Sequence, residues 1–142
     1  MKTIISKVTF LLILSISLLS CAQNINKETD TVEKASEDKV VSLISPVELN
    51  AKMGDIQLID IRTPQEFAEG HLKNASNINF YDNNFAAEMA KLDKTKGVYI
   101  YCRSGGRSGK ASKQLEKMGF SKVYDLKGGY KNWENNNLEV TK

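Results

Sequence analysis

The apolar residues of this chain fall into one long run near the amino terminus and a series of short runs from about residue 40 onward. The long run, Val8 to Leu19, is interrupted only by Thr9, Ser15 and Ser17. Residues 22–39 mix both charges with small polar side chains and have no apolar face, which is typical of a solvated tether. The pattern divides the chain into segments 1–20, 21–39 and 40–142, and the last has the size of one globular domain.

Two polar sequences mark helix starts in this domain. The segments 45–48 (SPVE) and 63–66 (TPQE) each combine a hydroxyl residue, a proline and a glutamate three positions after the hydroxyl. The hydroxyl and the glutamate form a capping box, and proline favours the first helical position. We therefore predict one helix from residue 46 to about Gly54 and another from residue 64 to Gly70.

Short apolar runs alternate with helical patterns through the rest of the domain. Val98 to Tyr101 is rich in β-branched and aromatic residues, as buried strands are. Phe85, Met89 and Leu92 recur at helical spacing. We predict strands at 57–61, 75–80, 98–101 and 123–126, and helices at 83–92, at 108–118 and from Gly128-Gly129 onward.

Alternating strands and helices favour an α/β fold with a mostly parallel central sheet flanked by helices, a three-layer sandwich. In such sheets, ligands bind beyond the carboxyl ends of the strands, where loops lead into helices. The candidate chemistry should therefore lie in the loop after Tyr101.

Composition and charge narrow the class of protein. The chain has 20 Lys and Arg against 17 Asp and Glu, and removal of Lys2 and Lys7 with the first 21 residues leaves 18 against 17, a net charge of +1. A nucleic-acid-binding domain usually has a strong basic excess. Two cysteines and one histidine provide neither a disulfide framework nor a zinc site. We expect no nucleic-acid partner, no metal, no cofactor and a monomer.

The amino-terminal segment has the profile of a secretion signal. Two lysines precede an apolar run that is shorter than the roughly 20 residues of a membrane-spanning helix. Leu18-Leu19-Ser20-Cys21 resembles the bacterial lipobox, in which a signal peptidase cuts before the cysteine and lipid is attached to it. We expect residues 1–20 to be removed, Cys21 to be lipidated, and the domain to lie in the cell envelope, on the periplasmic side, with lipid as its only membrane contact. An ordinary signal peptide with an incidental Cys21 is the alternative.

The loop that follows Tyr101 carries the most informative chemistry. Its residues are Cys102, Arg103, Ser104, Gly105, Gly106, Arg107 and Ser108. Small residues let backbone amides turn inward, and the start of a helix adds positive partial charge, so such a loop can hold an anion. The same features, with adjacent arginines, lower the pKa of a cysteine from about 8.5 to as little as 3.5–7.5. The pattern predicts a reactive thiolate at Cys102.

A series of short motifs runs in order through residues 40–142. They are Asp60-Ile61-Arg62, Glu66-Phe67, Gly70-His71-Leu72, Ala75 with Asn77-Ile78, the loop 102–108, and Leu126-Lys127-Gly128-Gly129 with Trp133. This order resembles that of a single-domain rhodanese. The resemblance implies a small rhodanese-like α/β fold and sulfurtransferase chemistry through a cysteine persulfide.

The resemblance also implies roles within the loop. Cys102 would be the nucleophile that takes the outer sulfur of thiosulfate or a similar small anionic donor and passes it to cyanide or a thiol. Backbone amides from Arg103 to Ser108 would stabilise the negative charge. We expect Arg103 to attract the substrate, Arg107 to brace the loop and Ser108 to cap the following helix.

Several other chemically suggestive residues are better explained by structural roles. By the resemblance, His71 belongs to a structural Gly-His motif. From their position at a strand end before a capped helix, Asp60 and Arg62 fit a hydrogen-bonded or ionic pair better than an acid–base pair. We expect Tyr99, Tyr101, Tyr124 and Trp133 in the core. Gly128-Gly129 should allow a close backbone approach near the loop.

Two alternative functions also use a cysteine in such a loop. Cysteine phosphatases and related arsenate reductases have five residues between Cys and Arg, whereas four separate Cys102 from Arg107 here. The shorter ring favours a pocket for a sulfane sulfur over one for a tetrahedral phosphate. The other alternative is a persulfide sulfur carrier with little turnover, and it stays open at this point.

Overall fold

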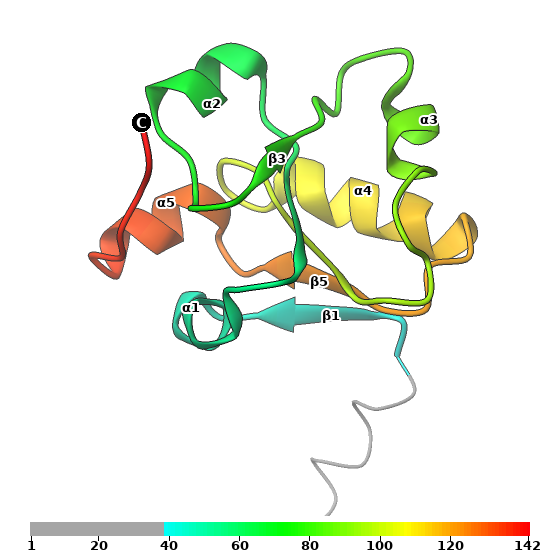
Figure 1. Cartoon of the computed structure of the whole chain (residues 1–142), viewed down its shortest axis with the longest axis horizontal. Coiled ribbons are helices and arrows are strands. Elements are labelled where there is room, and N and C mark those ends of the chain that lie inside the picture. The colour runs from blue at the N-terminus through cyan, green and yellow to red at the C-terminus, as the bar shows by residue number, and fades with distance from the viewer. Residues whose placement is uncertain (1–38) are drawn as a thin grey trace, which may run out of the picture. The chain divides into compact units, whose positions relative to one another are not determined.

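The computed structural model of the protein describes residues 39–142. The predicted signal peptide and the predicted lipidation of Cys21 lie outside these residues. Strands and helices alternate through the described range (Figure 1). The elements are β1 (Val41–Ile44), α1 (Pro46–Lys52), β2 (Gln57–Asp60), α2 (Pro64–Glu69), β3 (Ser76–Asn77), α3 (Phe85–Met89), β4 (Val98–Tyr101), α4 (Gly106–Lys117), β5 (Val123–Leu126) and α5 (Gly129–Asn135).

The strands form one five-stranded sheet in the order β1-β5-β4-β2-β3. Every pairing between these strands is parallel, as the sequence predicted for most of the sheet. Parallel neighbours need crossover connections, which the intervening helices provide. The carboxyl ends of β2, β4 and β5 consequently meet at one edge of the sheet, and the loop after Tyr101 starts from the central strand β4.

Helices cover both faces of the sheet and complete the predicted three-layer sandwich. Side chains alternate along β4, so that Val98 and Ile100 pack with α3 and α4 on one face, while Tyr101 packs with α1 and α5 on the other. Leu115 of α4 and Trp133 of α5 are among the most deeply buried side chains of the two faces. Within residues 39–142 no helix has the length and apolar character needed to cross a membrane.

Both predicted capping boxes are confirmed. At the start of α1, the Ser45 amide donates to Glu48 at 2.9 Å and the Glu48 amide donates to the Ser45 hydroxyl at 3.3 Å. At the start of α2, Thr63 and Glu66 make the same reciprocal pair. These hydrogen bonds satisfy backbone amides at the helix start that have no carbonyl partner within the helix. Each helix therefore begins at the proline that directly follows its N-cap residue.

Several elements differ from the sequence prediction, and three of them differ most. The strand β1 was not predicted, because its few apolar residues follow the polar tether and gain a partner only by pairing with β5. The predicted strand 75–80 is reduced to β3, which pairs at the sheet edge with only the last two residues of β2. The predicted helix 83–92 is reduced to α3, because the amides of Lys91 and Leu92 bond three rather than four residues back.

Candidate active site

Cys102 is the residue that directly follows β4, at the carboxyl edge of the sheet where the sequence predicted the candidate chemistry. The residue is 1% exposed, and it packs on the face of the sheet that α3 and α4 cover. Residues 103–105 turn over it before α4 begins at Gly106. The sulfur is therefore held between a buried strand end and the first turn of a 12-residue helix.

The loop directs hydrogen-bond donors at the sulfur. The Gly105 amide donates to Cys102 Sγ at 3.2 Å. Burial raises the pKa of the thiol, but hydrogen bonds from the hydroxyl and amide of Ser108 and from the amides of Ser104 and Gly105 outweigh burial. The pKa of Cys102 consequently lies below its ordinary value, as expected where backbone donors and a helix N-terminus favour the thiolate.

Ser108 does not cap α4, contrary to the sequence prediction. The helix begins two residues earlier, and its N-cap is Gly105, which has a left-handed φ of 101° and offers no side chain. Glycine adopts this conformation at no steric cost and lets the chain turn sharply from the loop into the helix. Ser108 is fully buried inside the first turn, with its hydroxyl 3.2 Å from the carbonyl oxygen of Gly105.

Arg107 joins the loop to α2. Its Nη1 and Nη2 donate to the two carboxylate oxygens of Glu66, each at 2.8 Å, and the two side chains are 16% and 19% exposed. The hydrogen bonds from Arg107 lower the pKa of Glu66 to about 2. Glu66 also serves the capping box with Thr63, so one carboxylate fixes both the start of α2 and the first turn of α4.

Glu66 is a site-supporting residue whose partner the sequence analysis did not identify. Its motif was recognised, but Arg107 stands 41 residues further along the chain. A glutamate three residues after a hydroxyl cap is explained by the capping box alone, so its sequence context does not indicate a distant arginine partner. Only the packing of α2 against the loop brings the two together.

Arg103 has a different setting from Arg107. It is exposed and lines a cavity of about 300 Å³ beside the loop. The other lining residues are Arg62, Glu66, Glu69, Gly70, Tyr130, Lys131 and Glu134. The expected role of Arg103 in attracting the substrate stays a prediction.

The first turn of α5 holds the backbone of the cysteine loop through hydrogen bonds. The amides of Tyr130 and Lys131 donate to the carbonyl oxygens of Cys102 and Arg103, at 2.8 and 3.0 Å. A Cβ atom on Gly129 would overlap the Cys102 carbonyl oxygen and stand 2.8 Å from the Arg103 carbonyl carbon. The predicted close approach at Gly128-Gly129 is confirmed, because a glycine is required where the two backbones meet.

A buried ion pair fixes the neighbouring strand end. Arg62 Nη2 lies 2.6 Å from Asp60 Oδ2, both side chains are almost fully buried, and the same nitrogen donates to the Gly70 carbonyl oxygen. The Arg62 guanidinium also lies 4.0 Å from the centre of the Tyr130 ring. The expected structural pairing of Asp60 and Arg62 is confirmed, and it ties the end of β2 to α5.

The sequence of this domain matches a known family over most of its length. The sequence model of the rhodanese-like domain matches residues 45–136. The chain belongs to the rhodanese-like domain family. The match contains the whole cysteine loop together with the elements that support it, α2 and α5.

Named relatives and a solved structure agree with this assignment. Thiosulfate sulfurtransferase 16, chloroplastic, of Arabidopsis thaliana is 34% identical over 116 residues, covering 73% of this chain and 96% of that protein. Thiosulfate sulfurtransferase GlpE of Pseudomonas aeruginosa is 31% identical over 106 residues, covering 74% and 86%. The crystal structure of a rhodanese-like domain protein from Staphylococcus aureus has a TM-score of 0.61 and 29% identity, covering 71% of this chain and 99% of that one.

The histidine of this rhodanese-like domain makes structural contacts. His71 Nδ1 lies 3.1 Å from the Phe67 carbonyl oxygen, and its ring stacks on Phe67 with centroids 3.8 Å apart. Its backbone pairs with Thr141. These contacts agree with the structural role expected for His71 and place it against the C-terminal segment.

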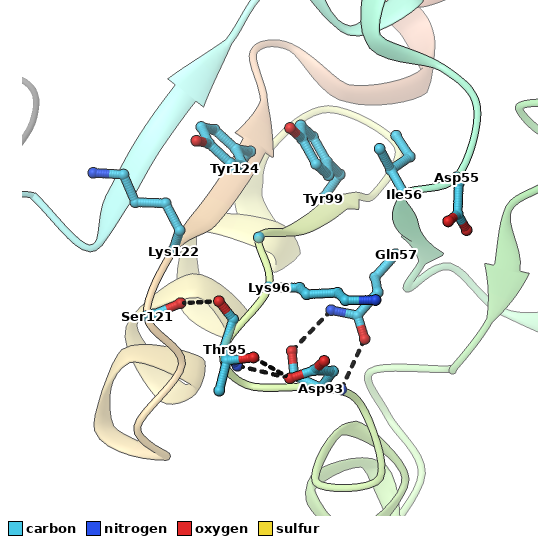
Figure 2. Close-up of a pocket in the computed structure, with 11 residues that line it drawn as sticks. Asp55, Ile56, Gln57, Asp93, Thr95, Lys96, Tyr99, Ser121, Lys122 and Tyr124 are labelled. Carbon is cyan, nitrogen blue, oxygen red and sulfur yellow. Dashed lines mark hydrogen bonds between the residues drawn. The ribbon is translucent and has the colours of Figure 1, made fainter.

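A second cavity lies at the opposite edge of the sheet, at the amino ends of β2, β4 and β5 (Figure 2). Several of its polar residues form hydrogen bonds with one another. The Gln57 side-chain amide donates to the Asp93 carbonyl oxygen, the Thr95 amide donates to the Asp93 carboxylate, and the Ser121 hydroxyl donates to the Thr95 carbonyl oxygen. Tyr99 and Tyr124, expected in the core, are half-buried and stack beside it, with centroids 4.5 Å apart. Among the described residues, no cysteine lines this cavity.

Proposed function

We propose that this protein is a sulfurtransferase that moves a sulfane sulfur from thiosulfate or a similar small anionic donor to cyanide or a thiol, through a persulfide on Cys102. The observation that carries the proposal is the hydrogen bond from the Gly105 amide to Sγ at the start of α4, which, with the lowered pKa of Cys102, favours the thiolate. Relatives that bear the name thiosulfate sulfurtransferase support the same chemistry.

In the first half-reaction, the Cys102 thiolate attacks the outer sulfur of thiosulfate. A new S–S bond forms to Cys102, the S–S bond of thiosulfate breaks, and sulfite leaves with its electron pair. The negative charge moves from Sγ to the outer persulfide sulfur. Amides already directed at this place, such as that of Gly105, stabilise that charge without reorganising.

In the second half-reaction, a cyanide ion or an acceptor thiolate attacks the outer persulfide sulfur. The bond to Cys102 breaks, the electron pair returns to Sγ, and the thiolate is restored. No external oxidant or reductant is needed in either half. The same donors therefore serve the resting thiolate and the persulfide.

The setting of Arg107 disfavours the phosphatase alternative. A cysteine phosphatase needs the arginine at the end of its loop to hold phosphate oxygens, in the paired geometry that guanidinium offers. Here both terminal nitrogens of Arg107 are bound to Glu66, and the loop between Cys102 and Arg107 is one residue shorter than in that class. Both features favour a sulfane sulfur over phosphate.

Mass spectrometry of the protein after exposure to thiosulfate tests the proposal. We expect the peptide that contains Cys102 to gain one sulfur atom, and the gain to disappear after addition of cyanide. A Cys102→Ser variant is the control and should gain no sulfur. Absence of the added sulfur at Cys102 would contradict the mechanism. A stable persulfide that releases its sulfur only once would instead favour the sulfur-carrier alternative.

We also propose that the protein is anchored to the bacterial cell envelope through lipid on Cys21, because the apolar run ends in a lipobox-like sequence and a polar tether follows. Replacing Cys21 with alanine is expected to shift the protein from the membrane to the soluble fraction, as measured by fractionation and immunoblotting. Full-length Cys102→Ser, which keeps Cys21, should stay with the membrane. Unchanged membrane attachment of the Cys21→Ala variant would exclude this anchor.

A further inference from the structure

The cavity of about 300 Å³ that Arg103 lines lies directly beside the cysteine loop. Residues at the end of α2 and in the first two turns of α5 form the rest of its lining. Two of them, Tyr130 and Lys131, also donate their backbone amides to carbonyl oxygens of the loop, the first to that of Cys102. A ligand in this cavity would therefore lie next to the segment that carries the nucleophile.

Two of the charged side chains in the lining are already neutralised. Arg62 is paired with Asp60 at 2.6 Å, and both side chains are almost fully buried. Glu66 is paired with Arg107 through both of its carboxylate oxygens. These pairs fix the wall of the cavity and offer a ligand little net charge. The charge available to a ligand therefore comes from the other lining residues.

The other charged residues of the lining carry both signs. They are two cations, Arg103 and Lys131, and two carboxylates, Glu69 and Glu134. All four are exposed, and none of them forms an ion pair within the part of the chain that the structure describes. Glu69 accepts a hydrogen bond of 3.4 Å from Gln65. Such a set of charges is complementary to a ligand that has both a carboxylate and an ammonium group.

The size of the cavity and the chemistry of the reaction narrow the ligand further. Ligand pockets span about 300 to 1,000 Å³, so this cavity is at the small end and suits a ligand of amino-acid size. Thiosulfate and cyanide carry negative charge alone and have no group for the two carboxylates. A thiol acceptor that also carries an ammonium and a carboxylate group can use both pairs of charges.

We propose that this cavity binds the sulfur acceptor, and that the acceptor is a small thiol of the cysteine type, with an ammonium and a carboxylate group. The inference rests on the proposed function, in which Cys102 holds a persulfide. The acceptor thiol loses its proton to solvent, and its thiolate attacks the outer persulfide sulfur. A new S–S bond forms, and the bond to Cys102 breaks with its electron pair returning to Sγ. The product is the persulfide of the amino thiol.

Four thiols of similar size test the charge requirement. Cysteine has both charged groups, 3-mercaptopropionate has the carboxylate, cysteamine has the ammonium group, and 2-mercaptoethanol has neither. With thiosulfate as the donor, sulfite release gives kcat/KM for each acceptor. The decisive quantity is the ratio of kcat/KM for each charged thiol to that for 2-mercaptoethanol, compared between protein variants. The intrinsic reactivity of each thiol cancels in this comparison, because it is the same with every variant.

Lys131→Gln is expected to lower the ratios for cysteine and 3-mercaptopropionate by about threefold, the effect of one exposed ion pair, and to leave that for cysteamine unchanged. The double variant Glu69→Gln with Glu134→Gln should lower the ratios for cysteine and cysteamine instead. Lys113→Gln and Glu116→Gln are the controls, because they remove the same charges from exposed positions of α4 outside the cavity. Unchanged ratios in both cavity variants, or equal changes in the controls, would overturn the proposal.

Binding can also be measured without sulfur transfer. S-methylcysteine keeps both charged groups and cannot accept sulfur. In saturation-transfer NMR, which observes the ligand, S-methylcysteine should give a signal with the unmodified protein that weakens with Lys131→Gln and persists with Lys113→Gln. Absence of this signal would overturn the inference even where thiosulfate and cyanide react. A protein that binds S-methylcysteine but forms no persulfide on Cys102 would support the cavity as a site for this class of ligand and contradict the proposed function alone.

Discussion

Replacing Cys102 with serine is expected to reduce sulfur transfer from thiosulfate to cyanide to the uncatalysed background. The serine hydroxyl stays protonated at neutral pH and is not a nucleophile toward sulfur, whereas the thiol is surrounded by donors that favour its ionised form. Loss of a catalytic nucleophile costs several orders of magnitude in turnover. Steady-state thiocyanate formation measures the effect.

The fold of the Cys102→Ser variant should be retained, because serine is slightly smaller than cysteine and its oxygen can accept the hydrogen bond from the Gly105 amide. Circular dichroism and thermal unfolding of the variant provide the control. Transfer that persists in a folded Cys102→Ser protein would remove Cys102 as the nucleophile. It would also remove the basis of the persulfide mechanism.

Removal of Arg107 is expected to decrease kcat by about 10²–10³, the range found when a preorganised donor is lost. Both terminal nitrogens of Arg107 bind Glu66 and thereby fix the first turn of α4 against α2. Without this pair, the amides that face the sulfur lose their support. Steady-state kinetics of Arg107→Ala with thiosulfate as the varied substrate measure the change.

Arg103→Ala is the matched comparison, because it removes the same charge from the same loop. Arg103 is exposed and lines the cavity beside the loop, so its loss should raise KM for thiosulfate and leave kcat nearly unchanged. Glu66→Gln tests whether Arg107 acts by bracing the loop or by binding substrate, because it weakens the Arg107–Glu66 pair and leaves Arg107 in place. If bracing is its role, this variant should also lose kcat. If both arginine variants change only KM, to a similar degree, the loop acts as a simple basic funnel and the division of roles is wrong.

The sequence by itself determined the features that depend on neighbouring residues. Both capping boxes form within four residues, so their hydroxyl and glutamate side chains identify the starts of α1 and α2 without reference to the rest of the chain. Alternating apolar runs likewise located β2, β4 and β5 within a residue. Since β4 ends at Tyr101, the position of Cys102 at a strand exit followed from the local pattern alone.

The tertiary structure decided the features that join distant parts of the chain. β1 exists because β5 pairs with it, and α4 starts at Gly106 because the left-handed Gly105 turns the chain before Ser108 is reached. Arg107 meets Glu66 only after α2 and the first turn of α4 have packed together. Sequence spacing carries no signal for such contacts, because side-chain pairing and burial depend on which surfaces meet in space. The local sequence therefore specifies the position of the candidate nucleophile, Cys102, while the contacts that support its loop are set by the fold.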